Sequence, residues 1–374
     1  MNKKRVVIKI GSSSLTNEKG EIDHKKLGDH VNALAMLHQH NFEVILVSSG
    51  AVAAGFRNLG YSSRPVTLKG KQASAAIGQG LLIHTYMNKF MEYNIRSAQL
   101  LLTRTDFSIQ KRYKNATSTM LELLERGVIP IINENDTVAV DELTFGDNDM
   151  LSALVSGAIH AAQLIILTDI DGIYDKHPGK YVSAKRYDTI DLITDEMIQE
   201  TDVSGSKLGT GGMKSKLMAA KVATSLGVPV FIGKGEGISK LLEIVNGNGE
   251  GTYVKSVRSK QIPIRKQWIS LHSTLEGKLL IDEGATQALM YNGSSLLSAG
   301  VVNIQGDFED GDVVEVYSRS KLLGRGQVSC SSEELKAAKT LKKAKQVTQL
   351  SAIEVIHRDS WVMVDQDQIK EELL

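Results

Sequence analysis

Two dense clusters of carboxylate and amide side chains frame one loop near the middle of the chain. The apolar run at 128–132 (VIPII) ends in the cluster 133–136 (NEND), and the cluster 146–149 (GDND) opens the next apolar helical pattern. A buried strand gathers polar groups where its carboxyl end meets solvent, and open α/β sheets bind their ligands at that edge. Asn and Asp are also ordinary turn and cap residues, and this alternative stays open for each of them singly. Two such clusters around one loop favour a binding site.

Lysine and small residues follow two further runs that are typical of strands. Residues 5–10 (RVVIKI) carry Lys9 and break into the loop 11–14 (GSSS), so we expect a buried first strand that brings a cation and backbone N–H donors to its carboxyl end. The alternative is that Lys9 lies at an edge of the strand. Residues 43–47 precede the small residues 48–55, which let a ligand approach the next helix. The unpaired N–H groups of that helix favour a carboxylate or a phosphate.

Two more segments have features of a nucleotide site. The run 163–167 (QLIIL) closes in Thr168 and Asp169, again at the carboxyl end of an expected strand. Residues 203–216 (VSGSKLGTGGMKSK) are rich in glycine and run into an apolar helix. Glycines, exposed amides and a lysine at the start of a helix suit a polyphosphate. A surface loop without a ligand is the alternative.

The pattern of the first two thirds of the chain is an alternation of strands and helices. Asp23 is a plausible N-cap for the helix 24–40, whose histidines (His24, His30, His38 and His40) we expect at the surface, since no carboxylate or cysteine completes a metal set. Residues 228–232 are the last expected strand. This alternation predicts a parallel sheet covered by helices on both faces.

The period changes in the last third of the chain. Residues from 246 turn glycine-rich and then basic, and later short β-rich runs are separated by Asn-Gly, Gly-Asp and Asp-Gly pairs. These features predict a small β-barrel or sandwich with one amphipathic helix at 333–346. We place the first domain at 1–254, a linker at 255–275 and the second domain at 276–374.

Composition excludes several classes of protein. The 44 basic and 43 acidic residues nearly balance, which argues against a dominant interaction with nucleic acid or an anionic membrane. Cys330 is the single cysteine and is expected to be structural. The apolar part of the N-terminus is too short for a signal peptide, and no run reaches transmembrane length. We therefore expect a cytoplasmic protein.

Five ordered motifs together resemble the amino acid kinase family and, within it, the glutamate 5-kinases. They are VVIKIGSSSLT (6–16), VSSGAVAAG (47–55), INENDTVAV with GDNDMLSALV (132–155), LTDIDGIY (167–174) and GTGGMKSKLMAA (209–220). Residues from about 276 resemble the PUA domain that many bacterial members carry. The resemblance implies an αβα sandwich of the amino acid kinase type, followed by a small β-rich PUA-like barrel.

The resemblance also implies a reaction. The family's glutamate 5-kinases transfer the γ-phosphoryl group of ATP, with Mg²⁺, to the γ-carboxylate of L-glutamate, the first step of proline biosynthesis. By motif, Lys9 and Lys216 resemble the cations that bind the transferring phosphate, and Asp149 the acid that positions them. The glutamate-binding residues would be Ser49, Gly50, Asn133, Asp136 and Asn148. The nucleotide contacts would be Lys9, Gly11, Ser12, Thr168, Asp169, Thr210, Gly211, Gly212, Met213, Lys214, Ser215 and Lys216. Residues that ligate the metal are not identified.

Other functions stay open at this stage. A kinase for aspartate, N-acetylglutamate, carbamate or a nucleoside monophosphate would share the glycine loops and lysines, and the NEND and GDND motifs favour glutamate. RNA binding through the PUA-like domain is disfavoured, because residues 276–374 hold 11 Lys and Arg against 16 Asp and Glu, whereas an RNA-binding surface is basic. The resemblance further implies a homo-oligomer, dimer or tetramer, and inhibition by L-proline.

Overall fold

The chain forms two compact units. The computed structural model describes residues 3–139, 147–176, 178, 181–200, 212–256, 266, 268–269, 273, 275–343 and 353–363. The first unit comprises Met1–Asp106 and Lys114–Gln261, and the second comprises Phe107–Tyr113 and Ile262–Leu374. Most of the expected linker lies outside the described residues, so the domain boundaries at 254 and 276 stay predictions.

The first unit is built on an eight-stranded sheet whose centre is β1. The strands follow in the order β3 (Ser97–Leu102), β4 (Ile129–Glu134), β2 (Glu43–Ser48), β1 (Arg5–Ile10), β5 (Gln163–Leu167), β7 (Val230–Gly233), β8 (Gly251–Val254) and β6 (Thr189–Ile190). From β3 to β7 all neighbours are parallel. Their carboxyl ends therefore meet at one edge, as predicted.

The prediction that residues 228–232 form the last strand is wrong. Strand β8 follows in sequence and pairs antiparallel with β7, and β6 pairs with β8. The four residues of β8 (GTYV) lie in a glycine-rich stretch that favours a linker by composition. Pairing with β7 nevertheless satisfies backbone groups that β7 would otherwise expose at the edge of the sheet.

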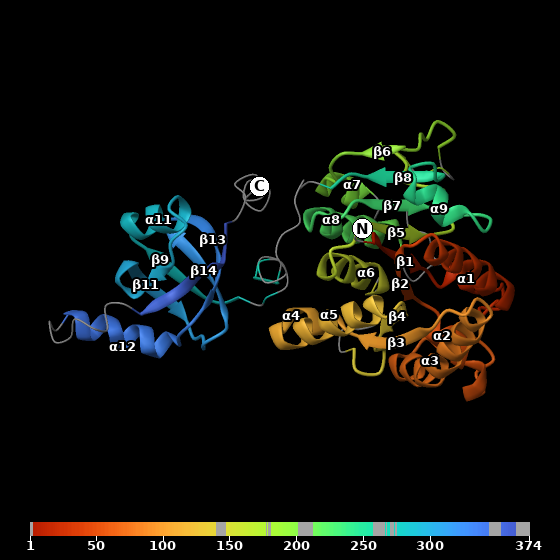
Figure 1. The fold of residues 1–374 in the computed structure, drawn as a ribbon, viewed down its shortest axis with the longest axis horizontal. Helices are drawn as coiled ribbons and strands as arrows, with labels where there is room; N and C mark the ends of the chain where they lie inside the picture. Colours follow the sequence, from red (N-terminus) through yellow and green to blue (C-terminus); the bar gives the residue numbers. More distant parts are fainter. Residues whose placement is uncertain are drawn as a thin grey trace. The chain divides into compact units, whose positions relative to one another are not determined.

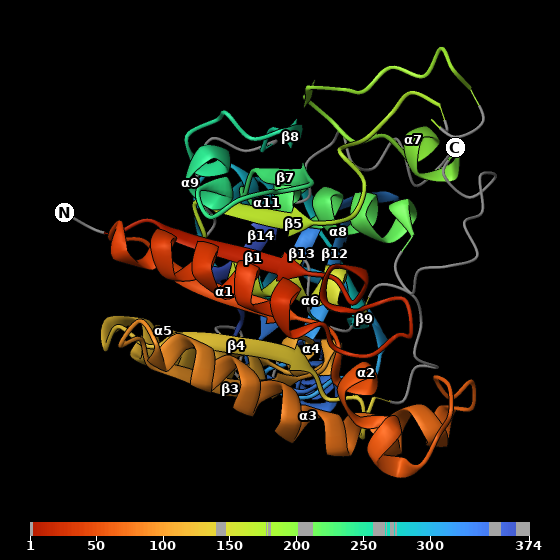
Figure 2. The same ribbon diagram turned by 90° about the vertical axis from the view of Figure 1, so that its right-hand side faces the viewer.

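Helices cover both faces of this sheet (Figures 1 and 2). One face packs against α1 (His24–Gln39), α3 (Leu68–Met91) and α9 (Lys240–Val245), with Leu34, Tyr86 and Leu241 in a common core with β1 and β2. The other face carries α6 (Asp147–Ala158) and α8 (Met213–Ser225). The remaining helices are α2 (Ala51–Gly55), α4 (Arg104–Ser108), α5 (Gln110–Glu125) and α7 (Asp195–Glu200). The fold class predicted from the sequence is confirmed.

Helix α1 shows one correct and one wrong prediction. The Asp23 side chain accepts hydrogen bonds from the N–H groups of Lys25 and Lys26, so the expected N-cap is confirmed. The expectation that His30 lies at the surface is wrong, because its side chain is buried. His30 follows Leu27 by three residues, which places both on the face of the helix that packs against the core.

A close helix crossing holds the turn between β2 and α2. An added Cβ at Gly55 of α2 would lie 2.0 Å from the carbonyl oxygen of Ser74 in α3, and one at Gly78 of α3 would lie 1.7 Å from that of Ala51. Only glycine lets the two backbones approach so closely. Because α2 begins directly after Gly50, which has a φ of +112°, this crossing fixes the turn that presents Ser49.

The second unit has its own core. A six-stranded sheet runs in the order β10 (Leu296–Leu297), β14 (Glu354–Met363), β13 (Lys321–Val328), β12 (Val313–Ser318), β9 (Leu275–Ile281) and β11 (Val301–Gly306), with helices α11 (Glu283–Met290) and α12 (Ser332–Lys343). Leu279, Val314 and Trp361 lie in its core, as does Cys330, which agrees with a structural cysteine. The predicted β-rich domain is confirmed. Among the described helices of the chain, none has the length and apolar character needed to cross a bilayer.

Candidate active site

Two lysines that are far apart in sequence meet at one buried carboxylate. Lys9 Nζ, from the central strand β1, lies 2.6 Å from Asp149 Oδ1, and Lys216 Nζ, from the first turn of α8, lies 3.5 Å from Asp149 Oδ2. The Ser215 hydroxyl donates to Asp149 Oδ2 at 2.7 Å. Asp149 is fully buried and both lysines are nearly so. The alternative that Lys9 lies at an edge of its strand is thereby excluded.

Electrostatics in this cluster favour the binding of a further anion. Burial alone would raise the pKa of Asp149, but Lys9 and Lys216 hold the pKa below its ordinary value, so the group stays a carboxylate. Burial lowers the pKa of Lys216, and the neighbouring Lys9 ammonium lowers it further, while Asp149 opposes this shift. Two ammonium groups meet at the Asp149 carboxylate, with the Asp169 carboxylate also acting on Lys216, and this pair of cations at one point is suited to a phosphate.

An amide network forms the second half of the site. Asn148 Nδ2 donates to Ser49 Oγ at 3.0 Å and to Asn133 Oδ1 at 2.9 Å. The backbone N–H of Glu134 donates to the side-chain oxygens of Asn133 and Asn148, at 2.9 and 3.2 Å. These residues come from the ends of β2 and β4 and from α6. They place oxygen and N–H groups of fixed orientation beside the lysine cluster, as recognition of a polar small molecule requires.

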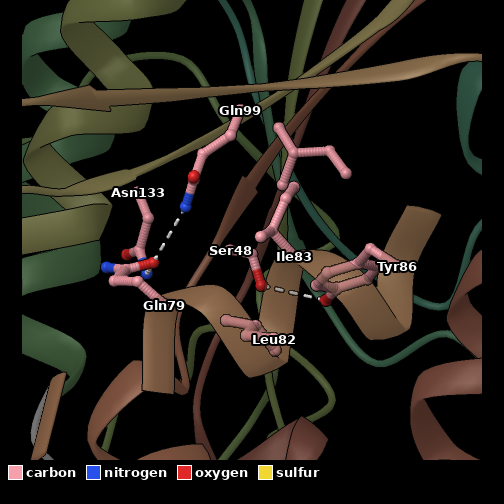
Figure 3. Close-up of a pocket in the computed structure, with 8 residues that line it drawn as sticks. Ser48, Gln79, Leu82, Ile83, Tyr86, Gln99 and Asn133 are labelled. Carbon is pink, nitrogen blue, oxygen red and sulfur yellow. Dashed lines mark hydrogen bonds between the residues drawn. The ribbon is translucent and has the colours of Figure 1, made fainter. Parts of the chain in front are cut away.

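Gln79 is part of this network, although the sequence analysis missed it. Its Oε1 accepts from Asn133 Nδ2 at 3.2 Å, and its Nε2 donates to the carbonyl oxygen of Glu134 at 3.2 Å and to Asp136 Oδ2 at 3.4 Å. Gln99 Nε2 also donates to Gln79 Oε1, at 3.5 Å (Figure 3). The only signal in the sequence was one amide side chain at helical spacing from Ala75 and Leu82.

A small cavity with a mostly apolar wall lies behind the network, between α3 and the sheet. It has a volume of about 10 Å³, and Ser48, Gln79, Tyr86 and Asn133 are among its lining residues (Figure 3). This volume holds about one water molecule. The cavity is too small for a substrate.

The first turn of α6 joins the two halves of the site. Asn148 belongs to the amide network, and the next residue, Asp149, holds the two lysines. Successive residues of a helix point about 100° apart, so one turn presents an amide to one side and a carboxylate to the other. A compact arrangement of a cationic half and an amide half follows from this geometry.

The remaining predicted residues that the structure describes lie in the loops after β1 and β5 or at the start of α8. Gly11 follows Lys9, and an added Cβ there would lie 3.4 Å from Lys9 Nζ. Ser12 starts the 3₁₀ turn 13–15, while Thr168 and Asp169 follow β5, with Thr168 Oγ1 donating to Asp169 Oδ1 at 3.1 Å. Gly212 and Met213 begin α8 and are half-buried, and Lys214 is exposed. Thr210 and Gly211 lie outside the described residues.

Comparison with known proteins identifies the family. The amino acid kinase family matches residues 4–234, and the PUA domain matches residues 277–350. The chain belongs to the amino acid kinase family. Within it, the chain is 91% identical over 372 residues to the glutamate 5-kinase of Oceanobacillus iheyensis, with both chains fully covered. It is 55% identical to glutamate 5-kinase 1 of Bacillus subtilis, over 97% of this chain and 100% of the relative. The chain is thus a member of the glutamate 5-kinases.

Solved structures show the same fold at low sequence identity. Carbamate kinase from Giardia lamblia bound to AMP-PNP superimposes with a TM-score of 0.51 at 17% identity, covering 68% of this chain and 99% of that one. At this level of identity the likeness supports the fold alone. The part of the chain that remains uncovered is consistent with an additional domain.

Proposed function

We propose that the protein transfers the γ-phosphoryl group of ATP to the γ-carboxylate of L-glutamate, giving L-glutamyl 5-phosphate and ADP. The observation that carries this proposal is the first turn of α6, where Asn148 enters the amide network and Asp149 holds Lys9 and Lys216. One side of the turn is built for a small polar substrate, and the other for the phosphate that is transferred to it.

The cationic half of the site suits phosphoryl transfer. The reaction asks the protein mainly to place its reactants in line and to neutralise negative charge. Asp149 keeps the ammonium groups of Lys9 and Lys216 at one point, and the Ser215 hydroxyl fixes the carboxylate. When phosphate enters, the lysines exchange part of their interaction with Asp149 for the phosphate oxygens. Because the groups are already in place, little reorganisation is needed at the moment of transfer.

The amide half suits glutamate. The γ-carboxylate is ionised at neutral pH, since carboxyl groups of this type have a pKa near 4.3, and it therefore needs no general base. The Ser49 hydroxyl accepts from Asn148 and can donate its own proton to the substrate. Asp136 offers a carboxylate for the substrate's ammonium group. Gln79 keeps Asn133 and Asp136 in position through its two hydrogen bonds.

The site fits Mg²⁺ that enters with ATP. Among the described residues, no group of three or more His, Cys, Asp or Glu side chains is arranged to hold a metal. Mg²⁺ is commonly held by one or two carboxylates and the substrate's phosphates. Both oxygens of Asp149 are engaged by Lys9, Lys216 and Ser215. Asp169, whose carboxylate acts on Lys216, is therefore the acidic residue that would hold the metal. When bound, the metal adds positive charge along the phosphate oxygens.

Three further properties belong to this proposal through the family. We propose inhibition by L-proline at or beside the glutamate site, because proline presents the same α-carboxylate and a similar ammonium group. A homo-oligomer, dimer or tetramer, is proposed as the assembled form. The cytoplasm, where ATP is available, is the proposed compartment.

The experiment is a substrate profile with ADP release as the readout. L-glutamate, D-glutamate, L-aspartate, N-acetyl-L-glutamate, carbamate and UMP are compared at equal concentration with ATP and Mg²⁺. We expect turnover with L-glutamate and formation of an acyl phosphate that hydroxylamine traps. Preferential turnover of another acceptor would assign the chain to a different kinase of the same fold.

A further inference from the structure

We propose that His30 and Lys240 act as a positioning pair that fixes the loop after β1 against the nucleotide side of the site. His30 lies on α1, and Lys240 is the first residue of α9. Lys240 Nζ lies 3.2 Å from His30 Nδ1, and His30 Nε2 lies 3.3 Å from the carbonyl oxygen of Ser14. This inference rests on the proposed function, because the loop is one that we assign to the phosphates of ATP.

The chemistry of the three groups dictates the direction of both hydrogen bonds. An ammonium group has donors and no acceptor, so Lys240 donates and His30 Nδ1 accepts. The proton of the neutral ring is then on Nε2, which donates to the Ser14 carbonyl oxygen. Burial, assisted by the charge of Lys240, lowers the pKa of His30 to about 3, so the ring is neutral at neutral pH. A single tautomer therefore connects Lys240 to Ser14.

Ser14 belongs to the turn that directly follows Lys9. Its N–H donates to the carbonyl oxygen of Gly11 at 3.2 Å, and the N–H of Leu15 donates to that of Ser12 at 3.1 Å. The hydrogen bond from His30 to the Ser14 carbonyl oxygen therefore helps to set the orientation of the peptide groups in residues 11–14. These are the peptide groups that face a phosphate held by Lys9.

Lys240 connects this turn to another loop at the same sheet edge. It follows the loop after β7, and the carbonyl oxygen of Gly233 at the end of β7 accepts a hydrogen bond from the N–H of Thr168. Strand β5 lies between β1 and β7. The pair therefore bridges the loops on either side of Thr168 and Asp169, the residues assigned to the nucleotide.

Stability alone does not explain a buried pair of this kind. Both side chains are buried, at 8% exposure for His30 and 5% for Lys240, and each must give up contact with water. Replacing a buried polar pair by apolar residues of similar size is often neutral or stabilising. What an apolar pair does not provide is a directed hydrogen bond to Ser14. A positioning role accounts for that bond.

The test is a double-mutant cycle with His30→Leu, Lys240→Met and the double variant. His30→Leu leaves an ammonium group buried without its acceptor, so we expect reduced thermal stability. The double variant removes both polar groups, and we expect its thermal stability to recover. Its KM for ATP should stay raised by about tenfold, the effect of losing one hydrogen bond of ordinary strength, with the KM for glutamate unchanged. A wild-type KM for ATP in the double variant would overturn the inference.

Two additional variants and one binding measurement complete the experiment. His30→Gln can accept from Lys240 and donate to Ser14, so it should restore the KM for ATP to within about twofold. His40→Leu, at the exposed end of the same helix, is the matched control and should leave both KM values unchanged. Calorimetric titration with AMP-PNP should show the same loss of affinity in the double variant. An unaltered affinity there would contradict the positioning role, whereas absence of glutamate phosphorylation by the wild type would contradict the proposed function instead.

Discussion

Asp149 contacts two ammonium groups and can neutralise only one of them. Each lysine can therefore also bind the transferring phosphate. Lys9→Ala or Lys216→Ala removes one preorganised cation, and such a loss typically costs about 100- to 1000-fold in turnover. We expect kcat to fall on that scale while calorimetry still detects glutamate binding. Lys221→Ala is the control, because Lys221 lies on the same helix α8 but pairs with Asp195. Near-normal kcat in either site variant would contradict the assignment.

The lowered pKa of Lys216 leads to a prediction about alkaline pH. The ammonium form is required for phosphate binding and is lost as the pH rises through the pKa, so a lowered pKa moves this loss to lower pH. The kinetic parameter kcat/KM for ATP reports the free enzyme. We expect it to decline at a pH below about 10.4, the ordinary pKa of lysine. Bound phosphate favours the charged form, so kcat should decline at higher pH than kcat/KM. Coincident declines of the two parameters would argue against Lys216 as the titrating group.

The glutamate half should respond independently of the nucleotide half. Asp136→Ala removes a carboxylate that we assign to the substrate, and Gln79→Leu removes the amide that holds Asn133 and Asp136. We expect both variants to raise the KM for glutamate by about tenfold or more, the usual cost of one or two charge-assisted hydrogen bonds. The KM for ATP should change little. A selective change in the KM for ATP would remove Asp136 and Gln79 from the glutamate site.

At the scale of helices and strands, the α2 and α3 crossing controls the turn that carries Ser49. Gly78→Ala places a Cβ 1.7 Å from the Ala51 carbonyl oxygen, so α2 must move away. We expect a loss of stability of about 1–3 kcal/mol from overpacking, together with a raised KM for glutamate. Chemical denaturation and steady-state kinetics measure the two effects.

Gly80→Ala provides a control on the same helix. An added Cβ at Gly80 meets nothing within 4 Å, so alanine there should raise stability by about 0.5–1 kcal/mol through its higher helix propensity. Kinetic constants should be those of the wild type. If Gly78→Ala and Gly80→Ala behaved alike, the close crossing would have no bearing on the glutamate site.

Strand ends were predictable because their chemistry is local. Lys9, Asn133 and Thr168 all lie where a run of apolar residues gives way to polar ones, and the parallel sheet brings such points to one edge. Gln79 and His30 lie inside helices, where one polar residue on an apolar face resembles an ordinary surface position. Their partners are 54 residues away for Gln79 and 210 for His30, so the pattern of neighbouring residues did not reveal them. Strand β8 was missed for a related reason. Its pairing with β7 determines that these residues form a strand, whereas their own composition favours a linker.

At the scale of the whole molecule, the described residues form two separate hydrophobic cores, one in each unit. The core around β1 and β2 supports the sheet whose edge carries the site, and a second core, which contains Leu279 and Trp361, supports the C-terminal sheet. Every described residue that we assign to glutamate or ATP belongs to the first unit. The second unit also includes Phe107–Tyr113 from the N-terminal part of the chain. We therefore expect catalysis to need only the first unit.

A chain that ends at Ser256 tests this division. Within the second unit, Trp268 Nε1 donates to the Ser108 carbonyl oxygen at 3.1 Å, and the Gln110 and Gln327 side chains exchange hydrogen bonds at 3.2 and 3.0 Å. Truncation removes these partners of the 107–113 segment. We expect kcat and both KM values within about threefold of wild type, because the site is retained, and a lower melting temperature.

Gln327→Leu tests the contribution of this side chain in the full-length protein. It removes the paired hydrogen bonds to Gln110 and the bond that Gln327 Nε2 donates to the Gly311 carbonyl oxygen at 2.7 Å, so we expect a loss of about 1–3 kcal/mol in the free energy of unfolding and unchanged kinetic constants. Circular dichroism establishes that the truncated chain is folded before its kinetics are compared. A folded but inactive truncated chain would mean that the C-terminal unit takes part in catalysis, and retained proline inhibition would place the inhibitor site wholly within the first unit.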